Sequence, residues 1–356
     1  MEIRGFWAEA AAAPDRPAII EAPGSVTTFG ELGARVNRLS HGLRTHGIGV
    51  GDTVAVLLPN RADLLALQFA TLQIGAYFTP VNRHLTGGET AYVRADSGAR
   101  LFVADARYTD VAMEAATAAG LPPQARWSTG SIEGFSDLAD LEAGPAAPVE
   151  DRTAGSMLLY SSGTTGRPKG IRRPLTGLSP EEDWLPAVEG MMAMFGATPG
   201  EGVLLTAGPL YHAAPNQFTA VALHLGHRVV LCRRFDAEET LGLIQRHQVT
   251  WSFMVPTMFH RLLSLPDRWR DAHDLSSLSA VAHAGAPCPM PTKQAMLEWL
   301  GPVLFEFYGA SESGTATLVR PRSGSPAPVL SAGRSPPWTS GSWTGRATTC
   351  RPANRA

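Results

Sequence analysis

Short apolar runs alternate with amphipathic segments along most of the chain. Runs such as Val54–Leu58 have the length and composition of buried strands, whereas leucine and valine recur at helical spacing from Leu32 to Leu43. Strands that alternate with helices indicate an α/β fold whose mostly parallel sheets are covered on both faces. The pattern predicts strands at 18–29 (two, around Gly24), 54–58, 76–80, 101–104, 202–206, 228–232, 250–254, 278–282 and 303–307, and helices at 32–47, 64–74, 89–95, 109–119, 216–225, 237–247, 258–265 and 291–300.

The same pattern divides the chain into three segments. We expect a first α/β subdomain over residues 1–153, a second over 154–319 that carries the nucleotide-binding motifs, and a tail over 320–356. Residues 121–153 are rich in Gly, Pro, Ala and acidic residues with weak periodicity, so we expect a surface connection there. Two halves of similar architecture predict a cleft at their junction, at the carboxyl ends of the strands.

The tail differs in composition from the rest of the chain. Residues 320–356 contain six arginines and six prolines among Ser, Thr and Gly, with no Asp, Glu or Lys. Such a segment buries too little apolar surface to offset its ordering entropy, which predicts disorder. A nucleic-acid-binding tail is one interpretation. Arginine without lysine, directly after a strand and turn, favours an out-of-frame or truncated terminus.

Composition excludes several classes of function. The 356 residues are 44% hydrophobic and carry a net charge of −2, so the chain is long enough for more than one core and has no electrostatic footprint for nucleic acid. Cys232, Cys288 and Cys350 are too few and too far apart for a disulfide framework or a CxxC metal site. With no signal-peptide pattern and no long apolar run, we expect a soluble cytoplasmic protein with small-molecule partners.

A glycine-rich stretch, Tyr160–Gly170, follows the apolar run 156–159. Its glycines let consecutive N–H groups converge on anionic oxygens, its hydroxyls donate hydrogen bonds, and its lysine adds a point charge. The spacing does not match a Walker A loop. We therefore expect a strand followed by another kind of phosphate-binding loop, rather than a Ser/Thr/Gly linker. The candidate residues are Ser161, Ser162, Gly163, Thr164, Thr165, Gly166 and Lys169.

A second motif, Phe307–Gly314, stands at the end of a predicted strand, where ligand sites of open α/β sheets gather. A tyrosine ring can stack on a purine, so Tyr308 is a candidate nucleotide contact. Glu312 is a candidate Mg²⁺ ligand, because hard cations prefer oxygen. The alternative interpretation is a polar turn at a strand end. The candidate residues are Tyr308, Gly309, Ala310, Ser311 and Glu312.

Together the two motifs closely resemble the signature sequences of the AMP-forming acyl-adenylate synthetases, which include acyl-CoA synthetases, luciferases and adenylation domains. Ser311 stands where the family's Tyr-Gly-x-Thr-Glu motif has threonine, and it keeps the hydroxyl. Ala284–Pro287 is similar to the family's adenine-binding loop, which adds Gly285, Ala286 and Pro287. Pro209–Ala214 is similar to the segment at the mouth of the acyl tunnel, which adds His212, although a structural histidine is the alternative. The resemblance covers about residues 15–319.

The resemblance implies the fold of the family's large domain and an acid–thiol ligase. Such an enzyme activates a carboxylic acid with ATP and Mg²⁺ to an acyl-adenylate and passes it to coenzyme A. Lys169, Ser311, Glu312 and His212 would be catalytic, with Glu312 the metal ligand. The chemistry requires that positive charge offset the repulsion between carboxylate and phosphate. Apolar residues near Trp251–Val255 and Tyr211 favour a hydrophobic acid, whether fatty, aryl or polycyclic.

Three features of the family have no counterpart in residues 320–356: the ribose-binding aspartate, the hinge arginine and the catalytic lysine of the small C-terminal domain. We therefore expect a truncated large domain. The alternative function is a catalytically impaired fragment that binds ATP or AMP and an acyl group. We also expect an unpaired sheet edge after Val303–Phe307, which would favour a homo-oligomer or a separate C-terminal polypeptide.

Overall fold

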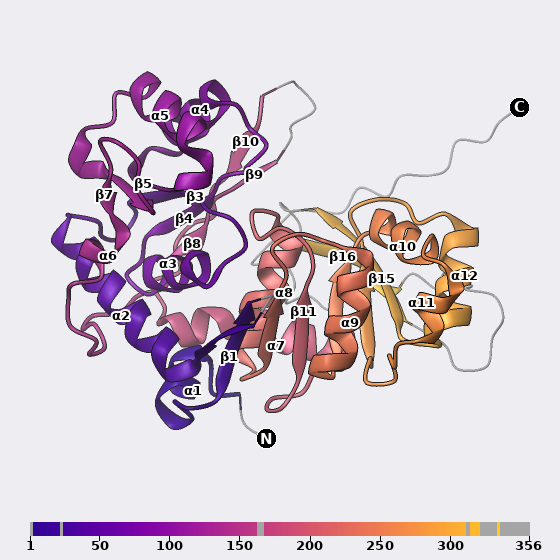
Figure 1. The fold of residues 1–356 in the computed structure, drawn as a ribbon. Helices are drawn as coiled ribbons and strands as arrows, with labels where there is room; N and C mark the ends of the chain where they lie inside the picture. Colours follow the sequence, from indigo (N-terminus) through magenta and orange to yellow (C-terminus); the bar gives the residue numbers. More distant parts are fainter. Residues whose placement is uncertain (1–2, 22–23, 162–166, 311–313, 321–332, 335–356) are drawn as a thin grey trace, which may run out of the picture.

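The computed structural model describes residues 3–21, 24–161, 167–310, 314–320 and 333–334. Two lobes lie side by side (Figure 1), one built on a six-stranded sheet and the other on a nine-stranded sheet. We call them the first and second lobe. The mixed α/β architecture with mostly parallel sheets confirms the predicted fold class.

The first lobe's sheet has the strand order β7-β6-β5-β3-β4-β8, and its pairs are all parallel. Alternate residues of its strands face α2 and α3 on one side and α4 and α5 on the other. Its elements are α2 (Phe29–Thr45), β3 (Thr53–Leu57), α3 (Ala62–Leu72), β4 (Tyr77–Pro80), α4 (Gly87–Ser97), β5 (Ala99–Asp105), α5 (Thr109–Ala118), β6 (Arg126–Thr129), β7 (Ser136–Asp137), α6 (Leu138–Leu141) and β8 (Ser156–Met157).

The expected surface connection over residues 121–153 is wrong. β6 and β7 extend the sheet next to β5, and Trp127, Leu138 and Leu141 are buried. These elements have only two to four residues each, too few for a period to emerge from a stretch rich in Gly, Pro and Ala.

The second lobe's sheet has the order β17-β16-β15-β14-β13-β11-β12-β1-β2. The six central strands β15, β14, β13, β11, β12 and β1 pair with one another in parallel. The outer strands β2, β16 and β17 are antiparallel to their neighbours. Its elements are β1 (Pro17–Glu21), β2 (Ser25–Thr28), β11 (Val203–Thr206), α8 (Ala213–His224), β12 (Arg228–Leu231), α9 (Ala237–His247), β13 (Trp251–Met254), α10 (Pro256–Leu263), α11 (Asp267–Asp271), β14 (Ala280–His283), α12 (Met290–Leu300), β15 (Leu304–Ala310), β16 (Gly314–Val319) and β17 (Gly333–Arg334).

One hydrophobic core is shared by the two lobes. It contains residues of α2 and α3 from the first lobe and of α8 and the inner face of the second sheet, while α9, α10 and α12 cover the outer face. The division at residue 153 stays a prediction, but the sheets cross it. β1 pairs with β12 of the second lobe, and β8, which begins at Ser156, pairs with β4 of the first.

Four α-helices of the described residues were not predicted: the short α6 and α11, and two longer helices that pack on the shared core. α1 (Phe6–Ala12) and α7 (Pro180–Phe195) both pack on the shared core through residues such as Phe6 and Val188. α7 begins at a capping box, in which Ser179 and Glu182 satisfy each other's backbone N–H groups. Pro186 inside α7 and the shortness of α1 weaken the helical pattern in the sequence.

The predicted unpaired edge after Phe307 is also wrong. β15 pairs with β14 on one side and antiparallel with β16 on the other. Within the segment predicted to be disordered, Gly333 and Arg334 pair with β16. The strand β16 escaped prediction because its residues are only partly buried and show no clear alternation.

Two smaller features concern membranes and thiols. In the described ranges, no helix combines the length and the apolar character needed to cross a bilayer. Cys232 and Cys288 are both free thiols, and burial raises the pKa of Cys232 to about 12.

His224 joins three helices of the shared core and generates a pH prediction. Its Nδ1 accepts a hydrogen bond of 3.2 Å from the backbone N–H of Phe6, its ring stacks on Trp184, and burial lowers its pKa to about 3. An unfolded histidine titrates near pH 6.5. Below this pH the unfolded chain binds a proton that the folded chain does not bind until about pH 3. The free energy of unfolding should therefore fall below pH 6.5, by up to about 1.4 kcal/mol per pH unit.

Urea unfolding at pH 7 and pH 5 measures this loss. His224→Gln keeps an acceptor but cannot take up the proton, so it should show a shallower pH dependence than the wild type. His260→Gln, at an exposed position of α10, is the matched control and should behave like the wild type. Equal pH dependence in all three proteins would contradict the prediction.

Candidate functional site

Most of the predicted site residues that the structure describes lie at or after the carboxyl ends of parallel strands in the second lobe. β11, β13, β14 and β15 run parallel, so their ends meet at one edge of the sheet. Gly285–Pro287 follow β14, Tyr308–Ala310 form the end of β15, and His212 follows β11. In an open α/β sheet this edge is where ligands bind.

The loop after β14 lies open at this edge. Gly285, Ala286 and Pro287 are exposed, and Gly285 has a φ of +87°, a conformation that favours glycine. A side chain at Gly285 would reach 3.5 Å from Cγ1 of Val255, the residue that follows β13. The loop is thus held next to the end of β13 before α12 begins at Met290.

Tyr308 is conspicuous because so much of a large aromatic side chain is exposed. Its relative exposure is 73%, and the pairing of β15 with β16 shifts register between Tyr308 and Gly309. A Cβ at Gly309 would overlap the carbonyl oxygen of Gly314, so only glycine fits this close approach. The predicted residues Ser311 and Glu312 lie outside the described residues.

His212 is the N-cap residue of α8. Its ring lies 4.6 Å from the ring of Tyr211, centroid to centroid. The pKa of His212 is lowered, first because neighbouring groups displace water from part of the ring and then because of the charge of His84. The imidazole is therefore neutral at pH 7, although part of it faces solvent.

The glycine-rich stretch forms an antiparallel hairpin of the first lobe, β9 (Leu159–Ser161) and β10 (Lys169–Ile171). In Figure 1 the hairpin stands on the side of the first lobe that faces the second. Lys169 pairs with Ser161 and is exposed. The strand expected before the loop is present as β9, and the lysine opens the returning strand. Ser162, Gly163, Thr164, Thr165 and Gly166 lie outside the described residues.

The structure thus brings Gly285–Pro287 and Tyr308–Ala310 together on adjacent strands of one lobe and places Lys169 on the other lobe. Aromatic side chains pack beneath the first group. The rings of Phe218 and Phe307 are nearly parallel, with centroids 6.3 Å apart, and Phe253 lies 5.9 Å from Phe307. Trp251 stands at the opposite end of β13 and donates to His227, so it belongs to the core and not to this edge.

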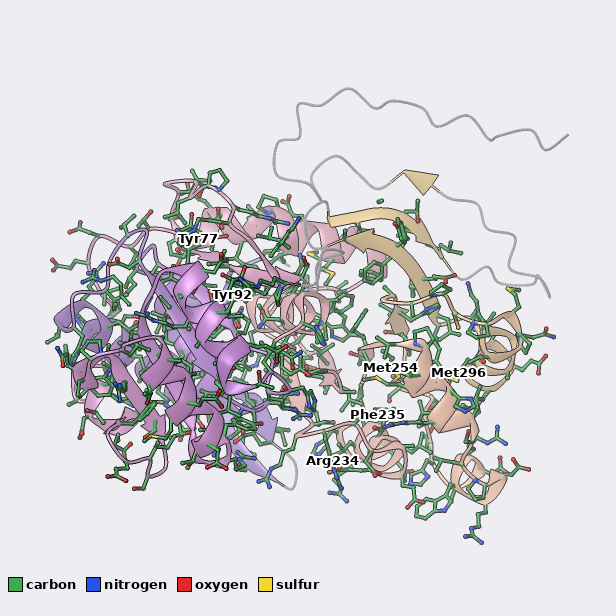
Figure 2. The ribbon with its side chains drawn as sticks, turned by 90° about the horizontal axis from the view of Figure 1, so that it is seen from above. Tyr77, Tyr92, Arg234, Phe235, Met254 and Met296 are labelled. Carbon is green, nitrogen blue, oxygen red and sulfur yellow. The ribbon has the colours of Figure 1, made fainter. Side chains whose placement is uncertain are left out.

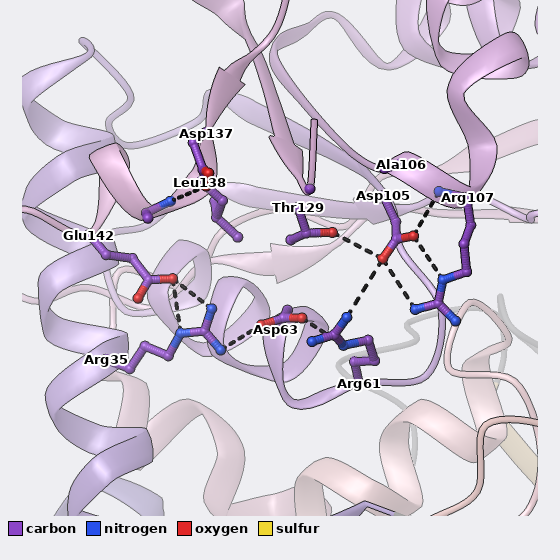
Figure 3. A pocket seen from close by; sticks show the side chains of 12 residues that line it. Arg35, Arg61, Asp63, Asp105, Ala106, Arg107, Thr129, Asp137, Leu138 and Glu142 are labelled. Carbon is purple, nitrogen blue, oxygen red and sulfur yellow. Dashed lines mark hydrogen bonds and ion pairs between the residues drawn. The ribbon is translucent and has the colours of Figure 1, made fainter. Parts of the chain in front are cut away.

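A separate pocket of about 530 Å³ lies in the first lobe (Figure 3), and sequence reasoning did not find it. Arg35 contacts Asp63 at 2.7 Å and Glu142 at 2.6 Å, while Arg107 pairs with Asp105. Burial alone would lower the pKa of Arg35, but the hydrogen bond to Glu142 and the charges of both carboxylates outweigh burial and raise it. The charges of this pocket are therefore largely paired among themselves, and none of the predicted site residues lines it.

The described residues offer no ready metal centre. Within them, no group of three or more His, Cys, Asp or Glu side chains could hold a metal ion. The predicted Mg²⁺ ligand, Glu312, is not among them, so no coordination geometry follows.

The two-lobed α/β fold with mostly parallel sheets is shared with the large domain of adenylate-forming enzymes. A model of the family "AMP-binding enzyme" matches residues 6–341, and the chain belongs to this family. The resemblance noted in the sequence is thereby confirmed.

Several of the similar proteins are CoA ligases. Feruloyl-CoA synthase of Amycolatopsis sp. is 35% identical over 314 residues, which cover 87% of this chain and 59% of that protein. 3-Hydroxybenzoate–CoA ligase of Aromatoleum sp. (strain CIB) is 30% identical over 337 residues, which cover 91% and 61%. The chain thus spans about three fifths of the length of these relatives.

Solved structures of two further proteins have a similar fold. ATP-bound MatB from Rhodopseudomonas palustris is 27% identical with a TM-score of 0.73, covering 92% of this chain and 63% of that one. The amide bond synthetase McbA from Marinactinospora thermotolerans is 25% identical with a TM-score of 0.76, covering 89% and 62%.

The close approach of Gly309 to Gly314 predicts that a side chain at position 309 weakens the pairing of β15 with β16. In Gly309→Ala the new methyl group must push β16 away from β15, which should lower the free energy of unfolding by about 1–3 kcal/mol. The sequence predicts that Tyr308 contacts the nucleotide, and Tyr308 would shift with the strand, so on that prediction affinity for adenine nucleotides should fall as well. Urea unfolding and calorimetric titration with ATP measure the two effects.

Gly242→Ala is the matched control. It lies within α9, where nothing stands within 4 Å of a new Cβ, so it should stabilise the protein by up to about 1 kcal/mol and leave binding unchanged. Wild-type stability and wild-type affinity in Gly309→Ala would overturn the prediction.

Proposed function

We propose that this chain forms the nucleotide- and acid-binding part of an AMP-forming acyl-CoA ligase that acts on an aryl carboxylic acid. The observation that carries the proposal is the pairing of β14 with β15, which sets the open glycine loop next to the exposed ring of Tyr308. One strand end supplies backbone that can approach a ligand closely, and the other supplies a flat aromatic face.

We assign the adenine ring of the nucleotide to this edge. The exposed ring of Tyr308 would stack on adenine, and Gly285–Pro287 would line the ring's edge without a large side chain in the way. Gly309 supports the same arrangement, because a Cβ there would displace the strand that carries Tyr308. We assign Ala310 to the same nucleotide-contacting segment.

The triphosphate requires positive charge and N–H donors. We assign this task to Lys169, at the start of β10, and to Ser161 with the following residues 162–166. A lysine on an exposed strand end can move toward a phosphate without desolvation of a buried charge. Mg²⁺, when bound, would offset the remaining phosphate charge, and we assign Glu312 as its ligand, with Ser311 beside it.

The acid is proposed to lie over the aromatic side chains near β13 and β15. Phe307 is half-buried and presents an apolar ring there, Phe253 packs against it from the core, and Val255 lies next to Gly285. An aromatic acid gains from such neighbours through ring packing as well as burial. A neutral His212 at the start of α8 would border this site without attracting the carboxylate away from the phosphate.

Relatives support the choice of an aryl acid. The names feruloyl-CoA synthase and 3-hydroxybenzoate–CoA ligase describe aryl acids as the substrates of those proteins. Coenzyme A is the thiol acceptor in both names, and we extend this acceptor to the present chain. The carboxylate would form a bond to the α-phosphorus of ATP with release of pyrophosphate, and the thiolate would then displace AMP.

A substrate panel tests the proposed acid. Pyrophosphate release should be faster with ferulate and 3-hydroxybenzoate than with acetate or alanine, because only the aryl acids offer a ring that can pack on Phe307. The measurement uses the chain at fixed ATP and Mg²⁺ with each acid in turn. A preference for acetate or for an α-amino acid would exclude the proposed class.

A charge deletion tests the proposed phosphate contacts. Lys169→Ala and Glu312→Ala should each weaken ATP·Mg²⁺ binding by about 1.5–3 kcal/mol, the usual value of a charge-assisted contact. Titration calorimetry measures the change. Arg268→Ala removes an exposed cation of α11 and serves as the control for net charge. If both variants bind ATP·Mg²⁺ like the wild type, the assignment of this site fails.

A further inference from the structure

We propose that Asp96, Tyr92 and Tyr160 are positioning residues that hold the hairpin β9–β10 so that Lys169 faces the nucleotide. We call these three residues the α4 clamp, because Asp96 and Tyr92 belong to α4. The inference rests on the proposed function, in which Lys169 contacts phosphate, and it assigns a task to residues outside the sequence motifs.

The hairpin needs an anchor because a two-stranded ribbon alone is only marginally stable in water. β9 and β10 pair with each other over only three residues each and form a separate two-stranded sheet. Without external contacts, the direction in which Lys169 projects would be poorly defined. The residues that tie this ribbon to the body of the first lobe therefore control the lysine.

The first tie holds β9. The hydroxyl of Tyr160 donates a hydrogen bond of 2.7 Å to Oδ2 of Asp96. Burial and then this carboxylate raise the pKa of Tyr160, so the phenol keeps its proton and remains the donor at all working pH values. A hydrogen bond to a charged acceptor is stronger than one between neutral groups.

The second tie holds the segment that leads into β10. The hydroxyl of Tyr92 donates to the carbonyl of Pro168 at 3.2 Å, and the guanidinium of Arg167 lies over the ring of Tyr92 at 5.4 Å. Tyr92 also approaches Asp96 at 3.5 Å, so the two ties meet on one helix face. Both sides of the glycine-rich loop are thereby attached to α4.

A third set of contacts holds the chain after the hairpin. The hydroxyl of Tyr77 donates to the carbonyl of Arg173 at 2.7 Å, and Arg172 stacks over the ring of Tyr77 at 4.1 Å. Figure 2 labels Tyr77 and Tyr92, which both belong to the first lobe. The hairpin is therefore attached at the middle of β9, just before β10 and just after β10.

The strand geometry explains how the clamp aims the lysine. Tyr160 pairs with Gly170, and a Cβ at Gly170 would lie only 3.1 Å from the ring of Tyr160, so the ring covers this position. Directly opposite residues share a face, and neighbouring residues point to opposite faces. Since Tyr160 points toward α4, Ser161 and Lys169 point away from it, and Lys169 is exposed.

The test compares a ligand with phosphates and a ligand without them. Asp96→Ala and Tyr160→Phe should each raise the dissociation constant for ATP·Mg²⁺ by about tenfold, the effect of about 1.4 kcal/mol. The dissociation constant for adenosine should stay unchanged, because adenosine makes no contact with Lys169. Asp96→Asn keeps an acceptor for the Tyr160 hydroxyl and should recover most of the lost ATP affinity. Titration calorimetry on the full chain measures the dissociation constants, and thermal unfolding measures the melting temperature of each variant.

Matched controls lie on the neighbouring elements of the same lobe. Asp110→Ala removes a carboxylate from the first turn of α5, and Tyr108→Phe removes a tyrosine hydroxyl just before that helix. Both should bind ATP and adenosine like the wild type. A second arm combines Asp96→Ala with Lys169→Ala. This pair should bind ATP no more weakly than Lys169→Ala alone, because the clamp acts through the lysine.

The outcomes separate the two proposals. ATP binding by the wild type with unchanged affinity in Asp96→Ala and Tyr160→Phe overturns the clamp alone. Equal loss of ATP and adenosine affinity, together with a lower melting temperature, shows a merely structural role and also overturns it. A wild-type chain that binds neither ATP nor adenosine overturns the proposed function and the clamp with it.

Discussion

Buried side-chain hydrogen bonds between the lobes are the constraint on which the site depends. Asn60, just after β3, donates to the carbonyls of Gly208 and Cys232 and accepts from the backbone of Leu210. Gln68 and Asn216 exchange two further bonds across the shared core. A buried amide left without a partner would lower the free energy of unfolding by about 1–3 kcal/mol. The lobes are therefore held in the arrangement that satisfies these groups. That arrangement turns the hairpin of the first lobe toward the strand ends of the second.

The proposed chemistry requires an unpaired positive charge on the hairpin and no competing unpaired cation in the pocket of the first lobe. Lys169 is exposed and able to approach a phosphate, whereas the arginines of the pocket in Figure 3 are held by Asp63, Asp105 and Glu142. A guanidinium already paired with carboxylates has little attraction left for a further anion. The ion pairs of Arg35 therefore link α2 to α3 and to the end of α6. They leave these guanidinium groups unavailable to compete with Lys169 for a phosphate.

Sequence patterns predicted the framework better than its details, for physical reasons. Strands such as β3 and β14 are buried on both faces and read as continuous apolar runs, so their ends, and with them Gly285 and Tyr308, could be placed. β6 and β7 were missed because two to four residues show no period, and α7 because Pro186 interrupts it. The α4 clamp could not be seen at all, since Asp96 and Tyr160 are far apart in sequence and carry no local signal.

The two faces of β14 and β15 show how one pair of strands can serve both the site and the core. Ala282 and Phe305 face the shared core, while His283 and Glu306 face α12, where Lys293 contacts Glu306 at 2.6 Å. Burial lowers the pKa of His283 to about 4, so the histidine is neutral and leaves Glu306 to pair with the lysine. A buried ion pair stabilises little beyond its own desolvation, yet it is costly to break. Glu306 lies two residues before Tyr308, and Lys293 belongs to α12, which follows the loop of Gly285–Pro287. A shift of β15 relative to α12 would therefore break this pair, so it ties the strand that carries Tyr308 to the helix that follows the glycine loop.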